Sequence, residues 1–183
     1  MKLIEPTIEF DKEIMRYRKE FIKDGSSMDG CGMLRYYEKT ADWLAAVEAC
    51  KHPETVPEGQ VPATLYLAVR EKDGRIVGML QFRHTLNDYT ALYAGHIGYS
   101  VRSSERRKGY ASEMLRQALP LCRDYGLERI LVCCRVENEA SRRVILKNGG
   151  VYDATVTEPR RGVTLERYWI DLTKEQMVQD AKR

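Results

Sequence analysis

Residues 101–111 read Val101-Arg102-Ser103-Ser104-Glu105-Arg106-Arg107-Lys108-Gly109-Tyr110-Ala111, and this stretch decides how the rest of the chain is interpreted. It follows an apparent β-strand over residues 96–101 and precedes a strongly patterned helix. The start of a helix presents unpaired N–H groups and a partial positive charge from the aligned peptide dipoles. Glycine lets the backbone approach a ligand closely, and basic side chains attract anions. The sequence therefore predicts a phosphate-binding turn here.

The turn matches neither of two common phosphate-binding patterns. The P-loop needs Gly-x-x-x-x-Gly-Lys-Ser/Thr and the dinucleotide fingerprint needs Gly-x-Gly-x-x-Gly, whereas this chain has Arg106-x-x-Gly109-x-Ala111. After the turn, apolar residues recur at intervals of three and four, which predicts one buried helical face. These residues are Ala111, Met114, Leu115, Ala118, Cys122 and Tyr125. Gly126 then favours the end of the helix, and Pro120 inside it predicts a kink or a lost hydrogen bond.

A second patterned segment follows. The apolar, β-branched run over residues 130–134 predicts a buried strand. Asn138 and Glu139 then favour the start of a helix over residues 140–147, and glycines at 149 and 150 favour its end. The order strand, basic turn, helix, strand, helix is therefore expected for residues 96–147.

These two segments resemble the two cofactor segments of the GNAT (Gcn5-related) N-acetyltransferases, which bind acetyl-coenzyme A. The turn is similar to the family's (Gln/Arg)-x-x-Gly-x-(Gly/Ala) pyrophosphate loop. Residues 138–150 are similar to the pattern Asn-x-x-Ala-x-x-Leu-Tyr-x-Lys-x-Gly-Phe, with Ile145 in place of the tyrosine and Gly150 in place of the final aromatic residue. The resemblance implies an α/β (α+β) fold, with three layers and a mixed, largely antiparallel central sheet.

The resemblance also implies one domain over residues 1–183. Residues 1–63 would form the helices and loops of the acceptor site, residues 64–172 the acetyl-CoA-binding core, and residues 173–183 a tail that we expect to be a frayed helix. Other patterns predict a strand at 2–8, helices at 11–23 and 34–50, strands at 64–71, 75–86, 151–158 and 163–172, and a turn at 87–94.

The family's cofactor contacts carry over to matching positions of this chain. The resemblance implies that the main chain of Tyr99 and Val101 pairs with the pantetheine arm, and that the Val101 N–H polarises the thioester carbonyl. The other cofactor-binding positions that it implies are Arg106, Arg107, Lys108, Gly109, Tyr110 and Ala111 at the pyrophosphate, and Asn138 and Ser141 at the pantetheine.

The general base is less clearly marked. His96 is the leading candidate, because it begins the expected strand and histidine titrates near neutral pH. Strict alternation along the strand puts His96 and Val101 on opposite faces, unless a bulge shifts the phase. Glu105, His84 and a relay of water to bulk solvent are the alternatives.

The proton donor for the leaving thiolate is open as well. Ile145 stands where many family members carry a tyrosine with that role. Ser141, Tyr152 or water would then have to supply the proton.

Composition narrows the class of protein. The chain has 183 residues, is 43% hydrophobic and carries a net charge of only +3, which gives little support to general nucleic-acid binding. The five cysteines have no metal-ligand spacing, so we expect no metal and a reducing, cytoplasmic setting. No signal peptide or long apolar run is evident, so we expect no membrane association.

The resemblance implies an enzyme that transfers the acetyl group of acetyl-CoA to a primary amine by direct attack in a ternary complex. We expect a small-molecule amine rather than a protein, partly because carboxylates in the loop at 24–29 would attract a cation. The alternative is a catalytically degenerate member that binds acyl-CoA as a sensor or regulatory module. The sequence leaves a homodimer open.

Overall fold

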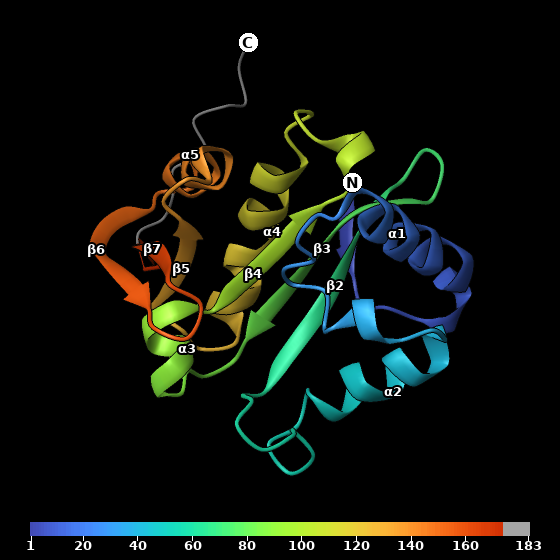
Figure 1. Cartoon of the computed structure of the whole chain (residues 1–183), viewed down its shortest axis with the longest axis horizontal. Helices are drawn as coiled ribbons and strands as arrows, with labels where there is room; N and C mark the ends of the chain where they lie inside the picture. The colour runs from blue at the N-terminus through green and yellow to red at the C-terminus, as the bar shows by residue number, and fades with distance from the viewer. Residues whose placement is uncertain (174–183) are drawn as a thin grey trace.

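The computed structural model describes residues 1–173 as a seven-stranded sheet with helices on both faces (Figure 1). The strands are β1 (Lys2–Ile4), β2 (Ala63–Arg70), β3 (Arg75–Arg83), β4 (Ile97–Val101), β5 (Arg129–Arg135), β6 (Val151–Glu158) and β7 (Val163–Asp171). The helices are α1 (Asp11–Asp24), α2 (Thr40–Ala49), α3 (Asp88–Tyr93), α4 (Tyr110–Asp124) and α5 (Glu139–Lys147), with 3-10 turns η1 (Ile8–Phe10), η2 (Leu34–Tyr36) and η3 (Ser103–Glu105).

The strand order is β1-β2-β3-β4-β5-β7-β6, and β4–β5 is the one parallel pair among the described strands. This confirms the predicted mixed, largely antiparallel sheet in a three-layer arrangement. Helices α4 and α5 cover one face through residues such as Met114 and Ile145, both fully buried. Helices α1 and α2 cover the other face over β2 and β3, where Tyr17 and Trp43 are fully buried.

Most expected elements are present, with three main differences. The strand expected at 2–8 ends at Ile4, and the helix expected at 34–50 is divided into η2 and α2. The predicted turn at 87–94 was wrong, because α3 forms there. A capping box explains this helix: the Asn87 side chain accepts from the Thr90 N–H at 2.9 Å, and the Thr90 hydroxyl accepts from the Asn87 N–H at 2.9 Å.

Helix α4 contains Pro120 and continues past it to Asp124. The tail expected to be helical lies outside the described residues from position 174 onward.

Strands β4 and β5 separate soon after they meet. Their register contains one pair, Ile97 with Val132, next to a bond from the His96 N–H to the Leu131 carbonyl at 2.7 Å. On its other side β4 pairs with β3 along its whole length, where the His96 carbonyl and the Arg102 N–H bond to β3. Alternate residues of a strand bond toward opposite edges, so the main-chain groups of residues 99 and 101 face the β5 side. The end of β4 therefore has an open edge.

The loop between α1 and α2 packs against the middle of β4, on the face of the sheet that α1 and α2 cover. A Cβ added to Gly30 would lie 2.1 Å from the Gly98 carbonyl oxygen, so the two glycine backbones are in direct contact. Beside them, the Tyr17 hydroxyl donates to the Ser100 carbonyl at 3.0 Å, and the Cys31 thiol lies 3.1 Å from the Ser100 hydroxyl. The loop is thus fixed to β4 next to the open edge.

Replacing Gly30 by alanine tests this close approach. Gly25 lies in the same loop with nearly the same backbone angle, φ +67° against +71°, but an added Cβ there meets nothing within 4 Å. We expect Gly25→Ala to cost about 1 kcal/mol of unfolding free energy from backbone strain alone. Gly30→Ala should cost about 3 kcal/mol or more, because a backbone must also move. Equal urea midpoints for the two variants would show that the loop does not pack on β4.

Candidate cofactor and acceptor site

The turn between β4 and α4 presents a row of free N–H groups. Arg107 and Gly109 have left-handed backbone angles, φ 62° and 82°, and α4 begins directly afterwards at Tyr110. The N–H groups of residues 107–111 donate no hydrogen bond to any residue of the described part of the chain. Successive free N–H groups in such a turn form an anion-binding concavity, reinforced by the start of a helix. The turn therefore fits a pyrophosphate, as the sequence predicts.

The three basic side chains of the turn have different surroundings. Arg106 donates from Nε to the Val101 carbonyl at 3.0 Å, and Lys108 donates to the Glu105 carboxylate at 2.8 Å. The Arg107 side chain is exposed and makes no hydrogen bond or ion pair within residues 1–173. Arg107 is thus the side chain with most freedom to meet a phosphate, while Arg106 and Lys108 brace the turn.

Glu105 anchors the turn from beneath. Its carboxylate is 5% exposed and lies 2.9 Å from Arg70 Nη1, 3.0 Å from Arg75 Nε and 2.8 Å from Lys108 Nζ. Burial alone would raise the pKa of Glu105, but the Lys108 hydrogen bond and the neighbouring cations lower it. The carboxylate stays ionised and surrounded by cations, which makes it a poor proton acceptor and a strong structural anchor.

A second anchor comes from α1. Glu20 accepts from the Ser104 N–H at 2.9 Å and from Arg102 Nε at 2.8 Å. Burial would raise the pKa of Glu20, but these bonds outweigh it and lower the pKa to about 2. Sequence reasoning missed both anchors, because Glu20 lies more than 80 positions from its partners and Glu105 lies 35 positions from Arg70.

The start of α5 faces β4 across the gap. Asn138 caps the helix by accepting from the Ser141 N–H at 3.0 Å. The Ser141 hydroxyl lies 2.8 Å from the Tyr99 hydroxyl, and burial raises the pKa of Tyr99, so the phenol is neutral. The predicted pantetheine residues of β4 and α5 are therefore brought together.

The two departures from the family pattern in α5 are structurally linked. Ile145 is fully buried, and a Cβ added to Gly150 would lie 2.4 Å from its side chain. The glycine thus leaves room for the isoleucine. Tyr152, one of the alternative proton donors, is 55% exposed and bonds to the Thr155 hydroxyl at 2.8 Å.

His96 is bound to the backbone of β5. Its Nδ1 accepts from the Leu131 N–H at 2.9 Å, and burial lowers its pKa to about 4, with a further contribution from the Arg83 charge. When Nδ1 accepts, the proton of the neutral ring is on Nε2, which leaves no lone pair free for a substrate proton. This geometry favours a role in joining β4 to β5, and the proposal that His96 is the general base stays a prediction for kinetics to test.

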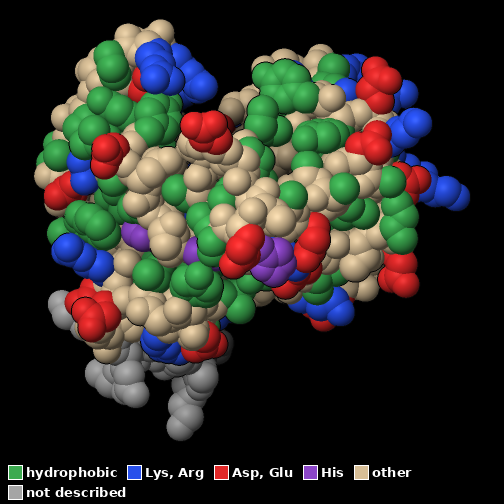
Figure 2. Space-filling model, turned by 90° about the horizontal axis from the view of Figure 1, so that it is seen from below, with side chains coloured by type: hydrophobic (Ala, Val, Ile, Leu, Met, Phe, Trp, Pro, Cys, Tyr) green, Lys and Arg blue, Asp and Glu red, His purple; other side chains and the backbone are tan. Residues whose placement is uncertain are grey.

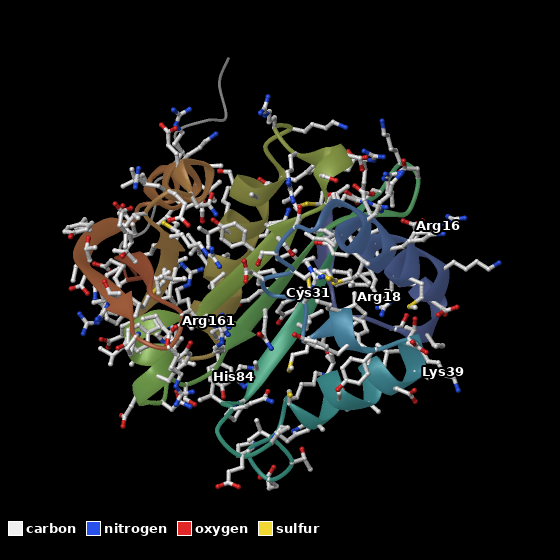
Figure 3. All side chains as sticks on the ribbon, viewed as in Figure 1. Arg16, Arg18, Cys31, Lys39, His84 and Arg161 are labelled. Atoms are coloured by element: carbon white, nitrogen blue, oxygen red, sulfur yellow. The ribbon has the colours of Figure 1, made fainter. Side chains whose placement is uncertain are left out.

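A hollow lies on the α1–α2 side of the open edge, and we call it the acceptor cleft. Gly98, Cys133 and Arg167 face this side of the sheet, since each alternates with strand neighbours packed in the α4–α5 core, and the Gly30 backbone lies against Gly98. The loop of residues 25–33 and the β6–β7 turn at 159–162 stand on either side, and Figure 3 shows Cys31 and Arg161 flanking β4. Figure 2 shows the molecule hollowed between the lobe of α3, β6 and β7 and the lobe of α1 and α2.

The fold and this site agree with sequence comparison. The model of the acetyltransferase (GNAT) domain matches residues 7–151, so the chain belongs to the GNAT acetyltransferase family. Membership confirms the predicted class of enzyme, an acetyl-CoA-dependent N-acetyltransferase, and acetyl-CoA as its co-substrate. No curated protein sequence is detectably similar to the whole chain.

Solved structures share the fold. One from Salmonella typhimurium, determined with its cofactor acetyl-CoA, has a TM-score of 0.66 at 16% identity over 99% of this chain and 98% of its own. A point mutant of spermidine N-acetyltransferase from Vibrio cholerae has a TM-score of 0.66 at 13% identity over 95% of this chain and 96% of its own. A ribosomal L7/L12 α-N-protein acetyltransferase with coenzyme A has a TM-score of 0.65 at 18% identity over 92% of both chains.

Residues 1–173 contain neither a candidate metal site nor a candidate membrane-spanning helix. No group of three or more His, Cys, Asp or Glu side chains there could hold a metal ion. No helix of this part is long and apolar enough to cross a membrane.

Replacing Gly109 by valine should abolish acetyl-CoA binding, because a side chain would occupy the space where the pyrophosphate approaches the backbone. An added Cβ meets no protein atom within 4 Å, so the variant should fold. Gly59→Val is the matched control, since Gly59 has φ +79° and equally open surroundings but lies in the connection before β2. Calorimetry that shows normal acetyl-CoA affinity for Gly109→Val would contradict the assignment of this turn.

The buried His96 ring should make stability depend on pH. Because its pKa is lowered to about 4 on folding, its contribution is complete above about pH 6.5 and is lost as the pH falls toward 4. We expect a loss of at most about 3 kcal/mol, and we expect His96→Gln to flatten this slope in urea unfolding between pH 7.5 and 4.5.

His52→Gln, at a side chain that is 58% exposed, is the control and should leave the slope unchanged. Parallel slopes for wild type and His96→Gln would contradict the burial argument. The same variant tests catalysis: turnover that falls most at low pH supports His96 as the base, whereas an unchanged rate between pH 6 and 9 removes it from the mechanism.

Proposed function

We propose that this enzyme transfers the acetyl group of acetyl-CoA directly to the primary amine of a small molecule, in a ternary complex. The observation that carries the proposal is the open edge of β4: the phosphate-binding turn follows the end of the strand, and the molecule is hollowed on the α1–α2 side of the sheet (Figure 2). Two substrates that meet at one strand edge from opposite sides need no covalent enzyme intermediate.

The division of the chain follows from this arrangement. Residues 64–172 supply the turn, the open edge and α5, and we assign them to the cofactor. Residues 1–63 supply the loop at 25–33, which covers β4 beside the cleft, and we assign them to the acceptor.

In the reaction, the thioester of acetyl-CoA supplies the acetyl group: the neutral amine nitrogen attacks its carbonyl carbon, the carbon–sulfur bond breaks, and coenzyme A leaves as the thiolate. The N–H groups of residues 107–111 bind the pyrophosphate, together with the Arg107 side chain. The main-chain groups of Tyr99 and Val101 hold the pantetheine arm, and the Val101 N–H donates to the developing oxyanion. Arg106 fixes the Val101 carbonyl at 3.0 Å and so orients that peptide.

The reaction needs two proton transfers, one from the acceptor ammonium group and one to the leaving thiolate. The acceptor cleft lets water carry the ammonium proton to bulk solvent, with His96 as the alternative base. At the thiolate end, the Ser141 hydroxyl at the start of α5 donates the proton, and the Tyr99 hydroxyl lies 2.8 Å from it. The side chain at position 145 has no proton to donate.

Initial-rate kinetics with a panel of primary amines tests the proposal, with coenzyme A release corrected for acetyl-CoA hydrolysis. Double-reciprocal plots that intersect, at varied amine and acetyl-CoA, are expected for a ternary complex. Parallel lines would indicate a covalent intermediate and contradict direct transfer. Tight acetyl-CoA binding without turnover on any amine or peptide would favour the sensor, and transfer to protein N-termini alone would overturn the small-molecule acceptor.

A further inference from the structure

One arginine in the acceptor cleft has no assigned role. Arg83 ends β3, and its Nη1 donates to the Gly95 carbonyl at 3.0 Å. Its Nη2 lies 3.7 Å from the position that a Cβ on Gly98 would occupy, so the guanidinium lies over Gly98. Gly98 directly follows Ile97, the last β4 residue paired with β5. The guanidinium therefore stands where the two strands begin to separate, on the acceptor side.

This cation has no close anionic partner. No carboxylate within residues 1–173 lies within 4.0 Å of it, whereas Arg167 on the same face pairs with Asp153 at 3.1 Å. Burial lowers the pKa of Arg83, and the Asp29 carboxylate opposes this shift only in part. A partly buried guanidinium that donates one hydrogen bond keeps several N–H donors free, and a carboxylate satisfies them best because it accepts two in parallel.

The other groups around Arg83 add no anion close to its guanidinium. His96 is neutral, and burial raises the pKa of the Cys133 thiol to about 12. Arg167 is a second guanidinium, already paired with Asp153, and its buried Nε has no hydrogen-bond partner in the described part of the chain. Arg161 stands on the β6–β7 side of the cleft (Figure 3). Among the described residues, Arg83 thus brings a guanidinium with no carboxylate within 4.0 Å to the side of the sheet from which the acceptor amine must arrive.

We propose that Arg83 binds a carboxylate of the acetyl acceptor, so that the substrate class is amines that also carry a carboxylate, such as α-amino acids and their short derivatives. This inference rests on the proposed transfer to a small-molecule amine and specifies its substrate. A carboxylate held by the Arg83 fork places the amine of the same molecule beside the open segment of β4. A polyamine would instead bring additional positive charge next to Arg83 and Arg167, at an energetic cost.

The test compares acceptors that differ only at the carboxylate. Each L-amino acid is assayed with acetyl-CoA beside its carboxamide and its decarboxylated amine, with spermidine and an aminoalkylphosphonate as further arms. We expect kcat/KM for the best amino acid to exceed that of its carboxamide and its decarboxylated amine by about 10- to 100-fold. Arg83→Gln should remove this preference and Arg83→Lys should restore part of it, because lysine keeps the charge but not the fork.

Arg16→Gln is the matched control. It removes the same charge from an exposed side chain on the outer part of α1, 69% exposed (Figure 3), and should leave the preference unchanged. Arg83→Gln should also keep the melting temperature and the acetyl-CoA affinity of the wild type, which separates a substrate contact from a folding defect. The defect should therefore appear in KM for the amino acid rather than in cofactor binding.

The outcomes separate the two proposals. Acetylation of spermidine or of carboxamides as efficiently as of amino acids would overturn the carboxylate site while leaving transfer to amines intact. A preference for the phosphonate, or an amino-acid preference that survives in Arg83→Gln, would overturn it too. Acetyl-CoA binding without transfer to any amine of the panel would overturn the proposed function and, with it, this inference.

Discussion

The separation of β4 from β5 is the constraint on which the rest of the site depends. A sheet interior normally pairs every strand on both edges, and unpaired main-chain groups are costly when they are also kept from water. Here pairing stops after Ile97 and Val132, and the free edge remains because both strands are held elsewhere. Strand β4 is paired with β3 and β5 with β7, while His96 joins the two strands at the point where they part. The fold thus keeps an unsatisfied edge that a ligand can complete.

The phosphate-binding turn is held in place by ion pairs between its basic side chains and neighbouring carboxylates. The N–H groups of residues 107–111 attract an anion, and basic side chains alone would repel one another without a ligand. The partly buried carboxylate of Glu20, from α1, and the buried carboxylate of Glu105, from the turn itself, offset their charge. On the opposite side of β4 the compensation is incomplete, since Arg83 lacks a close carboxylate among the described residues. We interpret the first arrangement as preorganisation for the cofactor and the second as the place where the acceptor carboxylate binds.

Most of the fold and the cofactor-binding half of the site could be predicted from patterns among residues that are close together in the sequence. Helical periodicity located α4 and α5, and the turn at 101–111 is contiguous, so its geometry could be predicted from its own residues. The capping box of α3 and the contact of Gly30 with Gly98 could not, because the first is a weak two-residue signal and the second joins distant segments. The burial of His96 could not be predicted either, because its partner Leu131 lies 35 positions away in the sequence. No pattern in the sequence marked Arg83, because its position over Gly98 depends on the pairing of β3 with β4.

The amide signals of the open edge and the turn test the central claim most directly. In ¹H–¹⁵N spectra of the assigned protein, titration with acetyl-CoA should shift the amides of Tyr99, Val101 and residues 107–111, and should slow their hydrogen exchange. NADH and ATP at equal concentration serve as controls for general phosphate binding. Shifts and protection confined to these residues and the start of α5 are the result that our account predicts. Tight binding that leaves the amides of Tyr99 and Val101 unshifted and unprotected would contradict it.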